Sequence, residues 1–384
     1  MGLASKLVLA YGVQQGAQVI GQLSKPTSPY PPVQGQPQQG YGAPPQGHAQ
    51  SYYNPQQQQH QQPQGDGYTP AYAAGGAVAG AAVGAAFNHG MGMPQQGGPT
   101  SNPNYIMNLL QACVHDQNLQ AFYPPGSLEL LAHRISQSGS LARIAQEWRL
   151  PLELAFDLAK LALFDIILYV DNSGSMAFEE NGSRIDDLKL ITQRVATAAA
   201  LFDTDGIQVR FMNTNLEGNH ITNEQQANQL IASVNFSGLT PLGTSLEQKI
   251  IQPLVVGPAR ANALRKPVLV IAVSDGEPAG EDRNAFLNAI RNAKAALQQT
   301  RYGPDALSIE LAQVGNDMKA RAFMEALDND PVAGGLLDVT GTYENEQDNM
   351  MRTTGINLTP DVWLLKLLCG GIDSSWDHKD ERRY

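Results

Sequence analysis

The sequence contains only two cysteines in 384 residues, Cys113 and Cys369, and they stand far apart in apolar stretches. We therefore expect two buried thiols rather than a disulfide, and the spacing matches no zinc site. Charged residues are also scarce, at 16% of the chain, and the formal net charge is −11. This acidic balance argues against nucleic acid or an anionic membrane as the main partner.

Long hydrophobic runs are missing as well. The apolar stretch after Lys6 in residues 1–20 is short for a signal peptide, and no cleavage site follows it. Residues 71–87 are uncharged and rich in Ala and Gly, but this run is shorter than the ~20 residues that a membrane span needs. We favour low-complexity chain over a membrane role there, and we expect a cytoplasmic protein.

Residues 1–100 contain a single acid, Asp66, and many Gln, Pro, Gly, Tyr and Ala residues. Such a segment has too little apolar surface to offset the entropy of ordering, which predicts a disordered N-terminal tail. Prolines at 26, 29 and 32 have a spacing that could bind an SH3 or WW domain. A solvated tail is the favoured interpretation.

A helical pattern begins after residue 101. Apolar residues recur at three- and four-residue spacing in residues 105–113, 127–135, 141–148 and 152–163, which predicts a small helical segment over 101–163. Part of it resembles a DNA-binding helix-turn-helix, but the four bases and four acids of residues 127–163 cancel. We expect it to pack on the next domain or to bind protein.

From residue 164 strand and helix patterns alternate, which predicts an α/β domain over 164–355. The expected fold is a doubly wound, mainly parallel sheet with helices on both faces. Residues 356–384 should form a C-terminal helix, over 361–368, and a loose charged tail. Strands are expected at 166–170, 207–212, 219–221 (an edge strand), 267–274, 307–314 and 335–339, and helices at 185–202, 222–234, 246–256, 283–299, 317–327 and 347–352.

A carboxylate and two hydroxyls follow directly on the apolar run 166–170. Asp171 ends that run, and Ser173 and Ser175 come two and four residues later. Ligands of open α/β sheets lie beyond the carboxyl ends of the strands, so these residues belong at that edge, on a loop that Gly174 allows to turn tightly. Oxygen ligands of this kind suit Mg²⁺ or Mn²⁺ better than zinc.

Two later stretches complete a pattern that resembles a known family. Residues 238–246 form a loop with Thr240 and Thr244, and the apolar run 268–274 ends at Asp275. Together and in this order, the three stretches resemble the von Willebrand factor A (vWA) domain and the inserted domains of integrins, over about residues 164–350. The chain is similar to fungal proteins of this family and, more distantly, to copines.

This resemblance implies a Rossmann-like fold and a metal-ion-dependent adhesion site (MIDAS) that binds Mg²⁺ or Mn²⁺. Thr240 rather than Thr244 matches the family's threonine, because it precedes the next helix by several residues. In the family, the serines ligate directly, the aspartates can act through water, and an acidic residue of a partner completes the coordination. By position, the implied ligands are Asp171, Ser173, Ser175, Thr240 and Asp275.

Each of these residues also has an ordinary interpretation, as a turn acid, a helix cap or a loop hydroxyl. Acids close to the motifs, such as Glu281, could tune the cation but more commonly carry solvated loop charge. The leading hypothesis is a cation-dependent protein-binding module without enzymatic activity. The alternatives are a metal-assisted hydrolase that uses Asp171, with His220 as the one histidine near the loops, and a secreted adhesin.

Overall fold

The structure is a computed structural model that describes residues 3, 5–7, 102–178, 182–202, 205–328, 330 and 336–376. These residues belong to one compact unit. The proline-rich stretch 26–32 and the Ala/Gly run 71–87 lie outside the described residues.

Six strands form one sheet in the order β3-β2-β1-β4-β5-β6, in which only the edge strand β3 is antiparallel to its neighbour. Leu168 of the central strand lies beside Val209 on one side and Ile271 on the other. The predicted α/β fold with a mainly parallel sheet is confirmed. The strands are β1 Asp165–Val170, β2 Ile207–Phe211, β3 Glu217–Ile221, β4 Val268–Ser274, β5 Leu307–Gln313 and β6 Leu337–Thr340.

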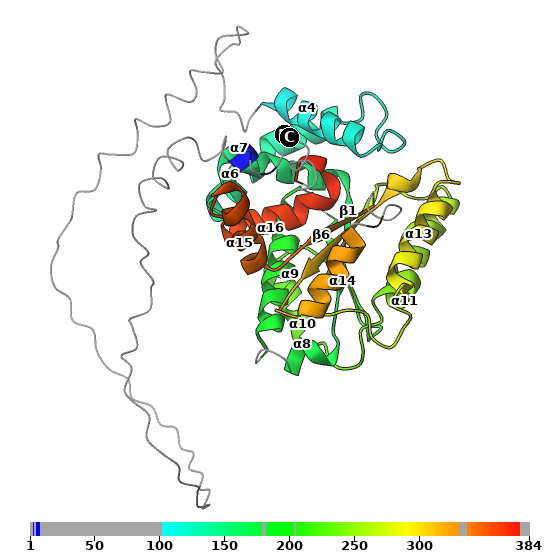
Figure 1. Cartoon of the computed structure of the whole chain (residues 1–384). Coiled ribbons are helices and arrows are strands. Elements are labelled where there is room, and N and C mark those ends of the chain that lie inside the picture. Colours follow the sequence, from blue (N-terminus) through cyan, green and yellow to red (C-terminus); the bar gives the residue numbers. More distant parts are fainter. Residues whose placement is uncertain are drawn as a thin grey trace, which may run out of the picture. The chain divides into compact units, whose positions relative to one another are not determined.

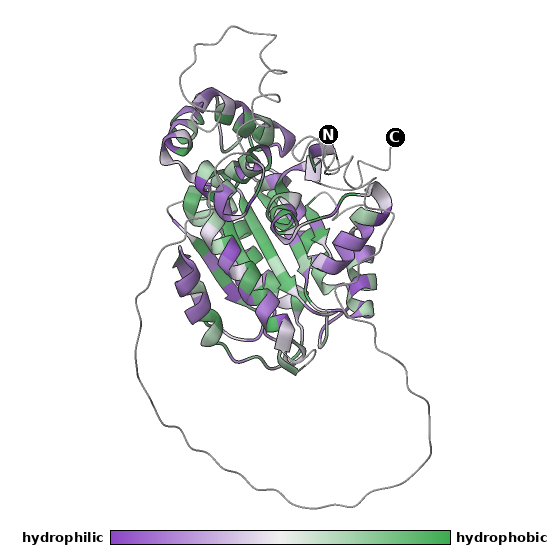
Figure 2. Cartoon of the chain, turned by 90° about the vertical axis from the view of Figure 1, so that its left-hand side faces the viewer, coloured by the Kyte–Doolittle hydropathy of each residue, from purple (hydrophilic) through white to green (hydrophobic). Residues whose placement is uncertain are grey.

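The central strands are apolar on both faces because both faces are covered. In β1, Leu168 and Val170 point into one hydrophobic core, and Ile167 and Tyr169 point into a second core on the other side. This two-residue alternation follows from strand geometry. Figure 2 shows the hydrophobic strands enclosed between helices whose outer surfaces are hydrophilic.

Helices cover both faces of the sheet, which makes the fold doubly wound (Figure 1). No helix among the described residues has the length and apolarity to cross a bilayer. On the first face lie α9 Ser183–Phe202, α10 Glu224–Ala232 and α16 Pro360–Cys369, with α15 Tyr343–Thr354 beside α16. On the second face lie α11 Leu242–Leu246, η4 Glu247–Val256, α12 Gly257–Arg260, α13 Ala285–Leu297 and α14 Met318–Asp328.

The expected helical segment shares the first core and is not a separate body. Its side chains pack with those of α9, α16 and the sheet. Leu3 and Leu7 are buried in the same core, so these residues differ from the tail expected over 1–100. The elements of the segment are α4 Pro103–Asp116, α5 Glu129–Ser138, α6 Ser140–Glu147, α7 Leu152–Ala155 and η2 Phe156–Leu163.

Two segments expected as helices contain helix types other than the α-helix. The helix predicted over 152–163 becomes a 3₁₀ helix from Phe156. Residues three apart eclipse in a 3₁₀ helix, which places Lys160 Nζ 2.7 Å from Asp157 Oδ1. The helix expected over 246–256 is a π-helix that contains Pro253. Proline lacks an N–H and clashes with the carbonyl one turn earlier, and the wider turn accommodates it.

The expected loose tail at 373–384 begins with a packed segment. Trp376 is buried, and its Nε1 donates to Asp157 Oδ2 at 3.0 Å. Asp373 forms ion pairs with Lys160 and Lys6. Against the effect of burial, these two lysines hold the pKa of Asp373 well below its usual range. The cluster therefore joins the first residues of the chain to its last described turn.

Two smaller expectations have clear outcomes. Cys113 and Cys369 are free and buried, as predicted. Thr222 and Gln225 have the spacing that predicts a capping box at the start of the helix expected over 222–234. In the structure the contacts lie one residue later: the Asn223 side chain accepts from Gln226 N, and the Gln226 side chain accepts from Thr222 N.

Candidate metal centre

In the first loop, residues 171–175, the side chain of Asp171 accepts two hydrogen bonds, one from the loop itself and one from β4. Asp171 Oδ1 accepts from Ser173 N at 2.8 Å, and Oδ2 accepts from Ser274 Oγ at 2.7 Å. Gly174, expected to allow a tight turn, has no positive φ and begins a short helix, α8 Gly174–Phe178. The position of Asp171 is therefore set by its own loop and by the end of β4.

The second loop, residues 235–241, is tied to the first through Asn172. The carbonyl of Asn172 accepts from Ser237 N at 2.8 Å, and its side chain donates to Asn235 O at 3.0 Å. The carbonyl of Gly238 accepts from Gly174 N at 3.1 Å. Thr240, the threonine chosen from the sequence, is buried in this loop just before α11.

The third loop, residues 275–281, closes the site. Ser175 Oγ donates to Asp275 Oδ1 at 3.1 Å and lies 3.0 Å from Ser173 Oγ. The carbonyl of Thr240 accepts from Ala279 N at 3.0 Å, which joins the second and third loops. Direct contacts thus join Ser173 to Asp171 and Ser175 to Ser173 and Asp275. Thr240 is connected to them only through the third loop, where its carbonyl meets Ala279.

The two carboxylates of this site are in an electrostatically unfavourable position. Asp171 and Asp275 are each 0% exposed. Burial and the neighbouring Asp275 raise the pKa of Asp171 to about 6, although hydrogen bonds from Ser274 and Ser173 favour its charged form. A divalent cation between the carboxylates would remove this repulsion, and the oxygen donors fit Mg²⁺ or Mn²⁺.

No family model matches the chain, and no curated protein matches it. Within the described residues there is no cluster of three or more His, Cys, Asp or Glu side chains that could hold a metal. The site above has two carboxylates, and its other donors are hydroxyls, so it depends on the geometry of the loops.

Arg184 is a component of the site that the sequence analysis missed. Its Nη1 lies 2.5 Å from Asp275 Oδ2, and the side chain is buried. A basic residue one position into a helix carries no sequence signal for such a contact. Glu281 was expected to be solvated charge, but its carboxylate accepts from Gly243 N and Thr244 N, both at 2.8 Å. It therefore holds the start of α11 next to Thr240.

His220 lies at the opposite edge of the sheet. It is in β3, where the neighbouring Ile221 pairs with Ile207 at the beginning of β2. Its ring Nδ1 lies 3.0 Å from Asp205 O. The three loops follow the carboxyl ends of β1 and β4 and the chain before α11, so His220 is not placed to serve Asp171.

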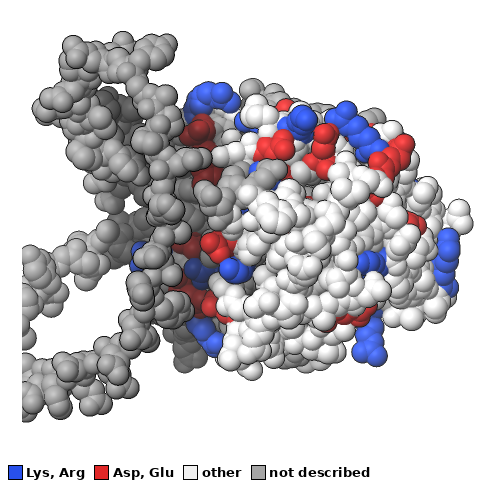
Figure 3. Space-filling model, turned by 90° about the horizontal axis from the view of Figure 1, so that it is seen from below, with Lys and Arg blue, Asp and Glu red and all other residues white. Residues whose placement is uncertain are grey.

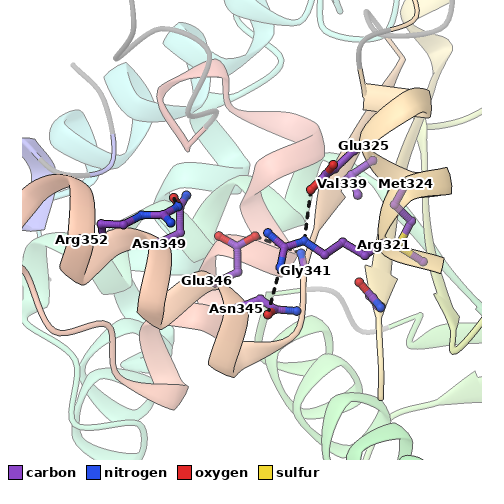
Figure 4. Close-up of a pocket in the computed structure, with 10 residues that line it drawn as sticks. Arg321, Met324, Glu325, Val339, Gly341, Asn345, Glu346, Asn349 and Arg352 are labelled. Carbon is purple, nitrogen blue, oxygen red and sulfur yellow. Dashed lines mark hydrogen bonds and ion pairs between the residues drawn. The ribbon is translucent and has the colours of Figure 1, made fainter. Parts of the chain in front are cut away.

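A separate polar pocket of about 330 Å³ lies between α14, β6 and α15 (Figure 4). Arg321 reaches into it, and its guanidinium donates to Glu325 at 3.1 Å and to Asn345 at 3.5 Å. Arg352 donates to Asn349 at 3.3 Å on its other side. Glu325 and Glu346 balance the two arginines in the lining. We assign no ligand to this pocket.

The surface around the three loops combines uncharged area with an exposed ion pair, in which Arg283 Nη2 lies 3.7 Å from Glu277 Oε2 beside the third loop. Figure 3 views the carboxyl edge of the sheet, and most of this face carries neither Lys and Arg nor Asp and Glu. Large apolar side chains are exposed there: Phe178 at the end of α8, Leu216 after β2, Leu239 beside Thr240, and Met318 after β5. Exposed apolar residues gathered at one edge are typical of a protein-binding surface.

Proposed function

We propose that the chain is a divalent-cation-dependent protein-binding module of the vWA type, and that Asp171, Ser173, Ser175, Thr240 and Asp275 hold Mg²⁺ or Mn²⁺. The observation that carries the proposal is the joining of three separate loops, in the family's order, around two buried carboxylates. A cation held there would supply a Lewis-acidic position for an acidic side chain of a partner.

The surrounding surface supports a protein as the partner. Exposed Phe178 and Leu239 flank the loops, and a large part of this face is uncharged (Figure 3). An acidic residue set among apolar residues would fit both features, because the carboxylate would meet the cation while its neighbours cover the apolar rim. Small charged metabolites and nucleic acid would leave that rim exposed.

We place this activity in the cytoplasm. The support is the state of the cysteines, since Cys113 and Cys369 are both free. Free thiols are the usual form of cysteine in reducing compartments. Protease protection of an epitope tag in intact cells tests this placement, and digestion of the tag at the cell surface contradicts it.

The function is tested by capturing partners on the full chain with Mg²⁺ and releasing them with EDTA. The full chain is needed because Leu3 and Leu7 are part of the core. We expect Asp171→Ala to lose capture of the released proteins. Leu239→Ser should weaken capture while Mn²⁺ binding stays at the wild-type level, because Leu239 lies outside the ligand set. Capture that EDTA does not release, or that survives Asp171→Ala unchanged, contradicts the proposal.

A further inference from the structure

The candidate metal centre contains a buried arginine, Arg184. It is the second residue of α9, its side chain is 3% exposed, and its guanidinium contacts a carboxylate that is fully buried. Arginine stays protonated at every accessible pH, so this contact places a permanent positive charge inside the site.

The fold makes room for that guanidinium. Gly315 follows β5 with φ +74°, and a Cβ at this position would lie 2.4 Å from Arg184 Nε and 3.0 Å from Cδ and Cζ. The backbone after β5 therefore packs directly against the side chain. This close approach holds the guanidinium against Asp275.

The two oxygens of Asp275 face different partners. Oδ1 accepts from Ser175 Oγ, which belongs to the expected ligand set. Oδ2 accepts from Arg184. The guanidinium thus compensates part of the negative charge that Asp171 and Asp275 bring together, and it does so on the side of Asp275 away from the serines.

We propose that Arg184 is a built-in counter-cation of this centre, which keeps the two aspartates together without a divalent ion and weakens the site's affinity for that ion. The inference rests on the proposed function and adds its regulation. An internal positive charge next to the ion opposes its binding over a short distance in a poorly screened environment. Binding would then depend more strongly on the acidic residue that a partner contributes.

Three variants of the full chain separate charge from packing. Arg184→Gln keeps a hydrogen-bond donor and removes the charge, and Arg184→Lys keeps the charge. Arg210→Gln is the matched control, since Arg210 is also buried but bonds to Gly218 and Asn219 at the β3 edge. Mn²⁺ affinity is measured by electron paramagnetic resonance, and the melting temperature is measured in EDTA and in Mn²⁺.

We expect Arg184→Gln to bind Mn²⁺ about tenfold more tightly than the wild type, because a like charge next to the ion is gone. Its melting temperature should fall in EDTA and recover in Mn²⁺. Arg184→Lys should bind Mn²⁺ as the wild type does. Arg210→Gln should melt earlier in both conditions, with unchanged Mn²⁺ affinity.

The remaining outcomes also decide for or against the inference. Wild-type or weaker Mn²⁺ affinity in Arg184→Gln would show that Arg184 only packs, and so would failure to fold in both EDTA and Mn²⁺. Folding of this variant in Mn²⁺ alone would support the proposal, because the ion then replaces the missing charge. If the wild type itself binds no Mn²⁺, the proposed function fails first.

Discussion

The protonation state of a buried acid in this protein depends on the charged groups beside it. Glu310 of β5 is fully buried and pairs in register with Asp338 of β6. Burial and Asp338 raise the pKa of Glu310 well above its ordinary value, and Lys366 opposes them only in part. Lys366 itself bonds to Glu346 at 2.8 Å. The acid on β5 is therefore held in its neutral form by its surroundings.

The pH dependence of stability tests this interpretation. A carboxyl whose folded pKa is raised contributes stability below its ordinary pKa, and this stability is lost as pH rises through the folded pKa. The Gln side chain of Glu310→Gln cannot ionise. We therefore expect the free energy of unfolding of this variant to exceed that of the wild type by about 1 kcal/mol or more at pH 9, and to differ less at pH 5. Urea denaturation at both pH values measures the difference. Glu325→Gln, at an exposed ion pair, should follow the wild type at both.

Helix α11 is positioned by contacts with the third loop and with α13. Its first turn receives the carboxylate of Glu281 from the third loop. Its Gly243 packs directly on the backbone at the start of α13, where a Cβ would lie 2.2 Å from Phe286 N. Because Thr240 stands just before this helix, the packing of α11 on α13 also places the second loop.

We therefore expect Gly243→Ala to force α11 away from α13. Overpacking of this kind costs about 1–3 kcal/mol, and a displaced second loop should also weaken Mn²⁺ binding. Chemical denaturation and Mn²⁺ titration measure the two effects. Gly371→Ala is the control, because a Cβ there meets its neighbours at 3.5 Å or more. Equal behaviour of the two variants would show that α11 has room to adjust.

Segments that lie far apart in the sequence pack together in one hydrophobic core. Leu3 and Leu7 are buried with helices α4 to α7, with α16 and with Trp376. Lys6 lies 4.7 Å from the centre of the Trp376 ring and bonds to Asp157 at 2.7 Å. The beginning of the chain is thus a structural part of the unit that carries the candidate site.

Truncation of one of these leucines tests that conclusion. Leu7→Ala should lower the free energy of unfolding by about 2–3 kcal/mol, as large-to-small changes in a core do. Leu130→Ala should change it little, since Leu130 is 84% exposed. Equilibrium denaturation of both variants gives the comparison. If Leu7→Ala were as stable as Leu130→Ala, residues 3–7 would not belong to the core.

The sheet could be predicted from the sequence because its strands are short apolar runs buried on both faces. The π-helix around Pro253, the 3₁₀ helix after Phe156 and the packing of Trp376 were missed. Each of these depends on contacts with other parts of the chain, and local spacing does not contain that information.

Part of the candidate site could also be predicted from the sequence, and part could not. The order of the three turns could be read from the sequence. Thr240 is buried before α11, whereas Thr244 is exposed within it. Arg184 could not be found, because its contact with Asp275 arises from the packing of α9 against Gly315. The basic residue that forms an ion pair with a buried aspartate can be identified only in the folded chain.

Calorimetric titration of the full chain with Mg²⁺ and with Mn²⁺, for the wild type and for Asp171→Ala, tests whether the three loops hold a divalent cation. We expect one divalent-cation site in the wild type and its loss in Asp171→Ala. The circular dichroism spectrum of Asp171→Ala should stay that of the wild type, because the change lies in a loop. Equal cation binding by the two proteins would contradict the proposed cation site.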